Sequence, residues 1–187
     1  MRKLVVFEWI TLDGVFDADT MDQWWIPYDS EDRQQYIQET YLTSGGYLMG
    51  RTTYEMLAPS WSSLKNNEMG IADKFNSAPK YVICSTPMKA DWNNTTVIHE
   101  NVEQEMKRLQ QKNGQHILVI GSATLVESLM QANLIDEYRF LVQPVIMGGR
   151  GGKRFFKDGM GMNRLKLVES KTLSLGVVVL RYTAAKN

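Results

Sequence analysis

The fold of this chain is decided by HILVIGSATLVESL, residues His116 to Leu129. An apolar run breaks at Gly121, Ser122, Ala123 and Thr124 and then resumes with helical spacing, which predicts a strand that turns directly into a helix. A turn of small residues leaves the first backbone N–H groups of the helix unpaired, at the positive end of the helix dipole. Because such groups bind phosphate, the stretch indicates a nucleotide site.

A second corner of the same kind lies upstream in YLMGRTTYE, residues Tyr47 to Glu55. The apolar strand ends at Gly50, and Arg51, Thr52 and Thr53 open the next helix. Small residues at such a junction can also serve close packing only, so each corner alone leaves both interpretations open. Two corners that both face phosphate fit one dinucleotide better than either fits alone.

The residue types near these corners favour NADPH over NADH. The planar guanidinium of Arg51 can hold a phosphate through two hydrogen bonds, whereas NAD-type sites usually read a ribose hydroxyl with Asp or Glu. A third apolar strand, within Lys80 to Pro87, brings Ser85 and Thr86 to the sheet edge where open α/β sheets bind ligands. We expect these hydroxyls to share the adenosine phosphate with Arg51, although Ser-Thr-Pro is also a common strand terminator.

Composition excludes several classes of function. The chain has 187 residues, 43% of them hydrophobic, and its 21 Lys and Arg balance 21 Asp and Glu. This balance favours neither nucleic acid nor a membrane surface, so we expect small molecules or copies of the chain itself as partners. Glu8 and Asp13 interrupt the N-terminal apolar run too early for a signal peptide or a membrane span, which predicts a cytoplasmic protein.

The cysteine and histidine pattern indicates neither a disulfide nor a metal site. Cys84 is the lone cysteine and stands in an apolar strand, so we assign it to the core. His99 and His116 lie far apart, with no Cys or carboxylate at ligand spacing, and we propose no metal.

Apolar segments alternate between strand-like and helix-like periods up to about residue 145, which is typical of an α/β sheet with helices on its faces. No linker divides the chain, so we expect one domain over residues 1–187. Two later apolar runs flank Ser174-Leu175-Gly176 and predict a β-hairpin. The sheet should therefore be mixed, mostly parallel with antiparallel strands at its C-terminal end. The expected strands are Arg2 to Ile10, the runs ending at Gly50 and at Pro87, the run from His116, Asp136 to Gln143, Leu165 to Leu173 and Val177 to Thr183. The expected helices are Ser30 to Leu42, a short helix after Gly50, Gly70 to Asn76, Val102 to Lys112 and Thr124 to Ala132. The segment from Pro59 to Asn67 is expected to be a polar loop.

Five motifs in order resemble the dihydrofolate-reductase-like superfamily, and within it the reductase domain of bifunctional riboflavin biosynthesis proteins. They are Thr11-Leu12-Asp13-Gly14, the segment from Met49 to Glu55, the segment from Ile120 to Leu125, Leu134-Ile135-Asp136-Glu137, and the segment from Pro144 to Gly149. The resemblance covers essentially the whole chain. It implies a three-layer α/β/α sandwich, NADPH bound across the carboxyl ends of the strands, and a homodimer.

Carried over by position, the resemblance distributes the coenzyme between the corners. Gly50, Arg51 and Thr52, with Ser85 and Thr86, would hold the adenosine half. The segment from Gly121 through Ser122 and Ala123 to Thr124 would lie against the pyrophosphate and the nicotinamide ribose. The chain departs from the riboflavin-pathway pattern at Val15, where a lysine is typical, and at Ser122, where a second glycine is usual.

The remaining candidates concern the substrate. Asp13 would bind a substrate hydroxyl or position a proton-bearing water, unless it serves only the Asp-Gly turn. By resemblance to dihydrofolate reductases, Asp32 in the first helix would face the substrate ring, unless it is only a first-turn charge that suits the helix dipole. Trp24 would form a wall for an aromatic substrate, or belong to a lid or a dimer contact. Gly148 and Gly149 would let the backbone approach the substrate, or belong to a solvated turn.

Two hypotheses follow. The first is an NADPH-dependent reductase of a small heterocycle, resembling 5-amino-6-(5-phosphoribosylamino)uracil reductase of riboflavin biosynthesis or dihydrofolate reductase. The second is a nucleotide-binding, self-associating protein of the same fold with little or no catalysis, which Val15 and Ser122 would allow.

Overall fold

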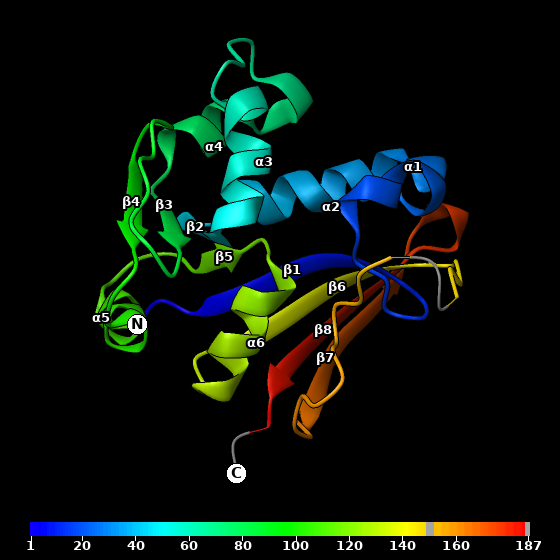
Figure 1. Ribbon diagram of the computed structural model, residues 1–187. Coiled ribbons are helices and arrows are strands. Elements are labelled where there is room, and N and C mark those ends of the chain that lie inside the picture. The colour runs from blue at the N-terminus through cyan, green and yellow to red at the C-terminus, as the bar shows by residue number, and fades with distance from the viewer. Residues whose placement is uncertain (149–151, 186–187) are drawn as a thin grey trace.

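The computed structural model describes residues 1–148 and 152–185 of the chain. The strands are β1 (Leu4–Thr11), β2 (Gly46–Gly50), β3 (Lys80–Ile83), β4 (Thr95–Ile98), β5 (Ile117–Val119), β6 (Glu137–Gln143), β7 (Leu165–Thr172) and β8 (Val178–Ala184). They form one eight-stranded sheet in the order β4-β3-β2-β5-β1-β6-β8-β7 (Figure 1). Strands β1 to β6 are parallel, whereas β8 runs antiparallel to both β6 and β7.

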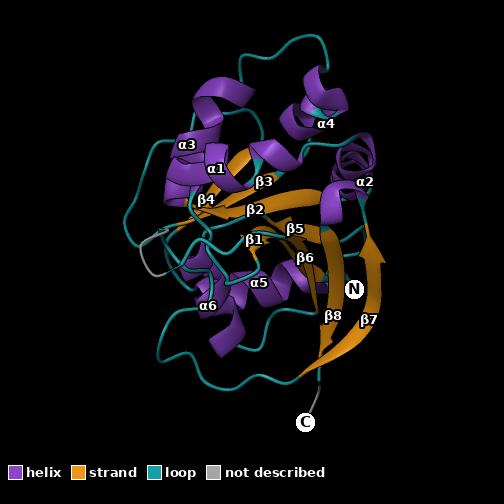
Figure 2. Cartoon of the chain, turned by 90° about the vertical axis from the view of Figure 1, so that its right-hand side faces the viewer, coloured by secondary structure: helices purple, strands orange, loops and turns teal. Residues whose placement is uncertain are grey.

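Helices cover both faces of this sheet. They are α1 (Met21–Trp24), α2 (Glu31–Leu42), α3 (Arg51–Trp61), α4 (Ala72–Ser77), α5 (Val102–Gln111) and α6 (Ala123–Gln131), with short 3-10 turns η1 (Ala18–Thr20), η2 (Ile26–Tyr28), η3 (Glu68–Gly70) and η4 (Ser174–Gly176). Figure 2 shows α1 to α4 on one face of the sheet and α5 and α6 on the other. The expected three-layer α/β/α sandwich with its C-terminal antiparallel hairpin is confirmed.

The alternation of β1 divides the core into two halves. Val5 and Phe7 face one side, where they pack with buried residues of α2, α3 and α4. Leu4 and Val6 face the other side, where they pack with α5 and α6. Because both faces are covered, the parallel strands are nearly continuous apolar runs, as buried parallel strands are.

The structure corrects three expectations about the elements. The polar segment from Pro59 does not begin a loop, because α3 continues through Pro59 to Trp61. Proline has no backbone N–H to donate to the carbonyl four residues earlier, and α3 ends within one turn after Pro59. Strand β4 was not predicted because it is short and half exposed. The excursion after β1 forms α1 and two 3-10 turns where the sequence indicated only a loop.

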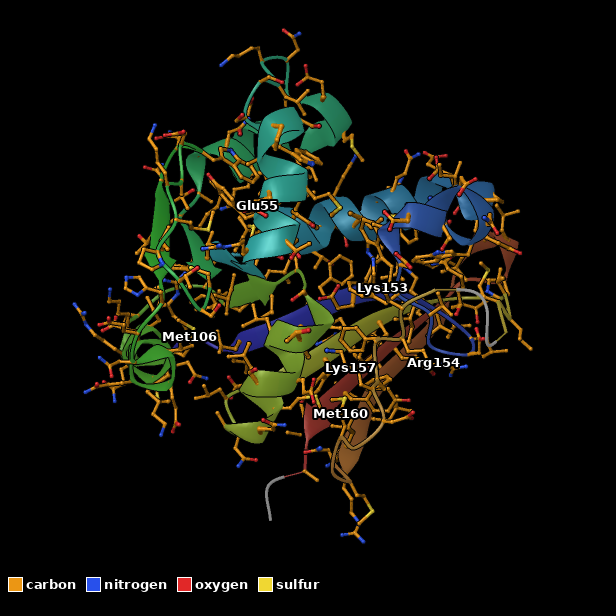
Figure 3. The ribbon with its side chains drawn as sticks, viewed as in Figure 1. Glu55, Met106, Lys153, Arg154, Lys157 and Met160 are labelled. Carbon is orange, nitrogen blue, oxygen red and sulfur yellow. The ribbon has the colours of Figure 1, made fainter. Side chains whose placement is uncertain are left out.

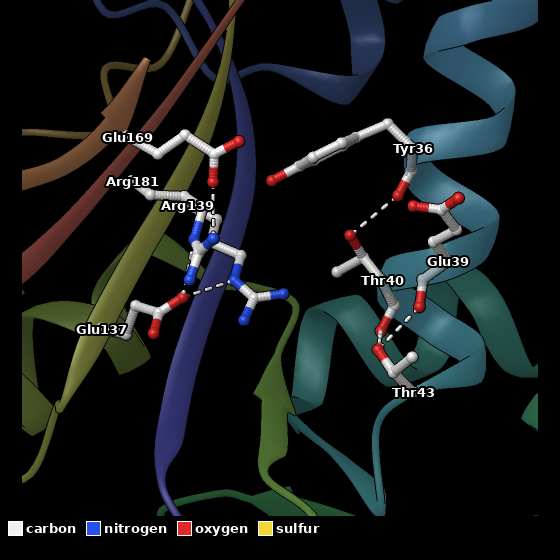
Figure 4. A network of polar contacts seen from close by, with 8 residues as sticks. All are labelled: Tyr36, Glu39, Thr40, Thr43, Glu137, Arg139, Glu169 and Arg181. Atoms are coloured by element: carbon white, nitrogen blue, oxygen red, sulfur yellow. Dashed lines mark hydrogen bonds and ion pairs between the residues drawn. The ribbon is translucent and has the colours of Figure 1, made fainter. Parts of the chain in front are cut away.

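An ion-pair network holds the C-terminal hairpin to the parallel part of the sheet (Figure 4). Glu137 of β6 accepts hydrogen bonds from Arg139 Nε at 2.6 Å and from Arg181 Nε of β8 at 3.2 Å. Arg181 also pairs with Glu169 of β7. Although partial burial raises it, these arginines lower the pKa of Glu137 below its ordinary value. The network therefore links three neighbouring strands through charges that share one face.

Within the described part of the chain, no helix has both the length and the apolar character that crossing a membrane requires.

Candidate active site

The two glycine corners lie in contact with each other. They follow the carboxyl ends of β2 and β5, which are neighbouring parallel strands. The backbone N–H of Gly50 donates to the carbonyl of Gly121 at 3.0 Å. From this point α3 leaves toward one face of the sheet and α6 toward the other, which is the arrangement that creates a ligand crevice in open α/β sheets.

Each corner needs its glycine because the other corner is so close. A Cβ added at Gly50 would lie 2.9 Å from Ser122 Oγ, and one added at Gly121 would lie 2.8 Å from Thr53 Oγ1. Gly121 also has a φ of +87°, in the region that side chains disfavour, and the Gly121–Ser122 peptide bond is cis. The glycines therefore permit the backbones of the two corners to approach.

A cavity of about 630 Å³ opens between the corners, β1 and the excursion that contains α1. Its volume and its mixture of apolar walls with a few polar groups are typical of small-molecule sites. The lining residues are Phe7, Glu8, Trp9, Phe16, Asp17, Ala18, Asp19, Met21, Trp24, Tyr41, Thr52, Thr53, Met56, Leu57, Ile120, Ser122, Ala123, Thr124, Lys153, Arg154 and Lys157.

The predicted corner residues Thr52, Ser122, Ala123 and Thr124 all line this cavity. Ser122 stands at the N-cap of α6, where its Oγ accepts from the backbone N–H of Leu125 at 3.4 Å. A cavity bordered by hydroxyls and by the start of a helix presents hydrogen-bond donors to an anion. The structure thus brings the second corner and part of the first to one wall.

Three cations lie on the segment after β6, where Figure 3 labels Lys153, Arg154 and Lys157. Lys157 Nζ donates to Thr124 Oγ1 at 2.7 Å and lies 3.5 Å from a carboxylate oxygen of Glu127. The sequence analysis did not single out Lys157, because 33 residues separate it from the corner that it reaches. Lys157 therefore adds a positive charge beside the start of α6.

Arg51, Ser85 and Thr86 lie outside the cavity lining. Arg51 Nη2 donates to the Thr86 carbonyl at 2.6 Å and to Thr86 Oγ1 at 3.0 Å, so these two predicted partners are in contact. Ser85 is exposed at the same strand end. The Arg51 Nε is buried, and no hydrogen-bond partner for it exists among the described residues. The guanidinium therefore keeps an unused donor next to the first corner.

Asp13 joins two loops and lies outside the cavity lining. Its carboxylate accepts from Thr11 Oγ1 at 2.6 Å, from the Met147 N–H at 3.2 Å and from the Gly148 N–H at 2.9 Å. Slight burial raises its pKa, but these hydrogen bonds outweigh that effect and lower it overall. Gly148 is thus tied to Asp13, and Gly149 lies outside the described residues.

Asp32 does not face the cavity, contrary to the expectation from the sequence. Its carboxylate accepts from the Ser30 hydroxyl at 2.7 Å and from the backbone N–H of Ser174 at 2.8 Å. These hydrogen bonds lower its pKa below the usual value. Ser174 lies in the connection between β7 and β8, which approaches the start of α2. Asp32 therefore joins this connection to the helix through hydrogen bonds.

Aromatic side chains form the inner wall of the cavity. Trp24 lines it as predicted and is 2% exposed, with its indole N–H donating to the Asp17 carbonyl at 3.2 Å. Trp9 also lines it and stacks on Trp25 with ring centres 3.8 Å apart. Arg33 lies over the Trp25 ring at 3.8 Å from its centre. Trp25 and Arg33 do not line this cavity, so only Trp9 and Trp24 of this aromatic group face it.

Glu8, like Lys157, lines the cavity without having been singled out as a functional candidate by the sequence analysis. It is a single carboxyl in the apolar strand β1, and that isolation is the signal that could have revealed it. Glu8 is 5% exposed and lines the cavity. Desolvation raises its pKa well above the ordinary value, and only the backbone of Gly121 partly opposes the shift.

This three-layer fold, with paired glycine corners opening into one cavity at the carboxyl edge of the sheet, defines a dihydrofolate-reductase-like protein. The chain belongs to the RibD C-terminal domain family, whose pattern it matches over residues 2–179.

Individual proteins are similar to this chain over nearly its whole length. The uncharacterized protein YyaP of Bacillus subtilis (strain 168) is 27% identical over 187 residues, covering 97% of this chain and 94% of that protein. A putative riboflavin biosynthesis protein from Shewanella sp. PV-4 superposes with a TM-score of 0.73 at 18% identity, covering 98% of this chain and 99% of that one. Dihydrofolate reductase from Enterococcus faecalis, complexed with NADP(H), gives a TM-score of 0.64 at 14% identity, covering 98% and 97% of the two chains.

Proposed function

We propose that this protein is an NADPH-dependent reductase of a small heterocyclic substrate. The observation that carries the proposal is the contact between the corners at Gly50 and Gly121, which open together into one cavity at the carboxyl edge of the sheet. An enclosed site with paired helix starts suits a ligand that carries two linked phosphates and two ring systems.

The residues present fit such a coenzyme. The corner at Gly121 offers hydroxyls and the start of α6 to the pyrophosphate, with Lys157 beside it. Arg51 offers its buried, unpartnered Nε next to the first corner, and Thr86 is already held by the same guanidinium. When bound, NADPH supplies a hydride, while the protein orients the reactants and supplies a proton.

The substrate would enter against the aromatic wall formed by Trp9 and Trp24. Flat rings stack on such planes, which favours a pyrimidine such as 5-amino-6-(5-phosphoribosylamino)uracil or a pterin such as dihydrofolate. The names of the similar proteins support this range, since they include a riboflavin biosynthesis protein and a dihydrofolate reductase with NADP(H). We further propose a cytoplasmic homodimer.

A binding titration followed by a turnover assay tests the proposal. We expect NADPH to quench tryptophan fluorescence and its own nicotinamide emission to change, because Trp9 and Trp24 line the cavity. NADPH oxidation is then followed with 5-amino-6-(5-phosphoribosylamino)uracil and with 7,8-dihydrofolate. Binding of neither NADPH nor NADH would rule out the reductase.

A nucleotide-binding protein without efficient catalysis is the second candidate, and Val15 favours it. Val15 is 1% exposed and packs inside, so this position offers no basic group where riboflavin-pathway reductases typically carry a lysine. Tight NADPH binding with no turnover of either compound would favour this second candidate.

Replacement of Arg51 tests the preference for NADPH. If the guanidinium reads the 2′-phosphate, Arg51→Ala should shrink the preference for NADPH over NADH by about 1 to 3 kcal/mol, the cost of a lost charged hydrogen bond. The ratio of the two dissociation constants measures this change. Lys89→Ala removes an exposed cation paired with Asp91 and serves as the control. An unchanged ratio in the Arg51 variant would remove Arg51 from this role.

A further inference from the structure

Glu8 is a carboxyl placed where apolar residues are otherwise the rule. Strand β1 reads LVVFEWIT, and Glu8 lies between Phe7 and Trp9, both of which line the cavity with it. The side chain is 5% exposed, and its Oε1 has no hydrogen-bond partner among the described residues. A buried polar atom without a partner is costly, so structural carboxyls are normally bonded.

The charged groups around the cavity do not compensate Glu8. Lys153 pairs with Asp17 and Asp19, and Lys157 pairs with Glu127. Two further titratable residues line the cavity. Arg154 Nη1 donates to the Asp13 carbonyl, and Tyr41 lies on α2. Since none of the ion pairs of the described residues includes Glu8, its ionised form would be a buried charge without a counterion.

Glu8 also stands close to the point where the reaction would take place. In the sheet, Glu8 lies opposite Phe140 of β6, and on its other side β5 ends just before the Gly121 corner. The backbone of Gly121 is near enough to influence the pKa of Glu8. Glu8 lines the cavity beside the corner that would hold the nicotinamide ribose, on the opposite face of β1 from Phe7 and Trp9.

We propose that Glu8 is the proton donor of the reaction, acting from the wall of the cavity that it lines. This inference rests on the proposed function. The substrate it suits is a flat heterocycle with a reducible C=N or C=O bond. The carbon of that bond accepts the hydride from NADPH, which leaves as NADP⁺, and the nitrogen or oxygen accepts the proton of Glu8. The Glu8 carboxylate that remains then takes a proton from water.

The sign of the stability change follows from the protonation states. The folded protein keeps the Glu8 proton over a pH range in which the unfolded chain has released it. Wild-type stability should therefore fall as pH rises from about 4.5, an ordinary glutamate value, toward the folded pKa of Glu8. Glu8→Gln has no proton to lose at this position, so the decline should be smaller in that variant.

The first experiment measures the proton directly. In protein labelled with ¹³C at the glutamate carboxyl, the signal that disappears in Glu8→Gln is assigned to Glu8. We expect the titration midpoint of Glu8 to lie well above the ordinary glutamate value. Urea unfolding at pH 5 and pH 8 should show a larger loss of wild-type stability than of Glu8→Gln stability.

The second experiment measures the reaction. We expect Glu8→Gln to bind NADPH within threefold of wild type but to transfer hydride to 5-amino-6-(5-phosphoribosylamino)uracil or 7,8-dihydrofolate at least about 100-fold more slowly in a single turnover, as loss of a general acid does. A Glu8 midpoint at the ordinary glutamate value, or a wild-type rate in Glu8→Gln, overturns the donor role and leaves the proposed function standing. Failure of the wild-type protein to bind NADPH, or to reduce either compound, overturns the proposed function instead.

Discussion

At the scale of single residues, the position of Gly121 imposes two requirements that only glycine meets. Its φ is +87°, and a Cβ would lie 2.8 Å from Thr53 Oγ1. The first requirement concerns the backbone alone, whereas the second arises only because the other corner lies against it. Gly159 has a similar φ of +85° with nothing within 4 Å of the added Cβ, so the chain contains its own control.

Gly121→Ala should therefore weaken NADPH binding in addition to lowering the unfolding free energy. Both Gly121→Ala and Gly159→Ala should lose about 1 to 2 kcal/mol of unfolding free energy from the left-handed backbone. Only Gly121→Ala should push the corners apart and raise the NADPH dissociation constant, by at least about tenfold or 1.4 kcal/mol. Urea unfolding and fluorescence titration measure the two effects. Equal NADPH affinity in both variants would contradict a role of the corner contact in binding.

The acidic residues show how the surroundings determine the role of one residue type. Asp32 accepts hydrogen bonds from Ser174 and stays ionised, and Asp13 accepts them from Met147 and Gly148. For Glu8, desolvation outweighs the backbone of Gly121 and raises the pKa, and its Oε1 has no hydrogen-bond partner among the described residues. Hydrogen bonds to a carboxylate lower its pKa, whereas burial without them raises it.

At the scale of elements, a buried lysine fixes the junction between α4 and β3. Lys80 is 0% exposed, and its Nζ donates to the carbonyls of Phe75 at 2.8 Å, Asn76 at 3.0 Å and Ala78 at 2.9 Å. These carbonyls belong to the end of the helix, where no intrahelical donor remains for them. The ammonium also lies 4.7 Å from the centre of the Trp92 ring.

Lys80→Met should lower the unfolding free energy by about 1 to 3 kcal/mol, because buried carbonyls lose their donor. Lys89→Met changes an exposed lysine in the same way and should leave stability nearly unchanged. Urea unfolding of the two variants measures the difference. If Lys80→Met is as stable as Lys89→Met, the helix end is satisfied by other groups and the junction does not depend on this side chain.

At the scale of the whole molecule, the sheet ends at β7, whose outer edge pairs with no strand of the described residues. Nearly all of β7 is exposed, including Leu167 at 51% and Val168 at 50%. Exposed apolar edge strands tend to pair with another chain. This edge is therefore where the expected homodimer can be tested.

If two copies join at this edge, the wild-type protein should have twice the mass of one chain by light scattering, and Leu167→Lys should shift it toward the monomer. Leu175→Lys changes a leucine of similar exposure, 56%, in the turn beyond the strand and should leave the dimer intact. A monomeric wild-type protein at about 50 μM would contradict the homodimer. Dissociation by both variants, or by neither, would contradict this edge as the interface.

The sequence by itself determined the class of fold. Short segments of neighbouring residues are enough to predict the strand-to-helix corners at Gly50 and Gly121, the alternation of apolar periods and the hairpin around Ser174-Leu175-Gly176. Periodicity and turn chemistry depend on residues a few positions apart, so such windows carry them. Strand β4 and the helical turns after β1 were not predicted, because their sequence patterns are too short.

Only the tertiary structure decided how the site is composed. The contact of Gly50 with Gly121, the reach of Lys157 to Thr124 and the hydrogen bonds from Ser174 to Asp32 join residues that are distant in the chain. Desolvation, ion pairing and cavity shape depend on such distant neighbours. In the sequence, Glu8 is therefore only an acidic residue within an apolar strand. Its burial and its place in the cavity lining arise only once the sheet is assembled.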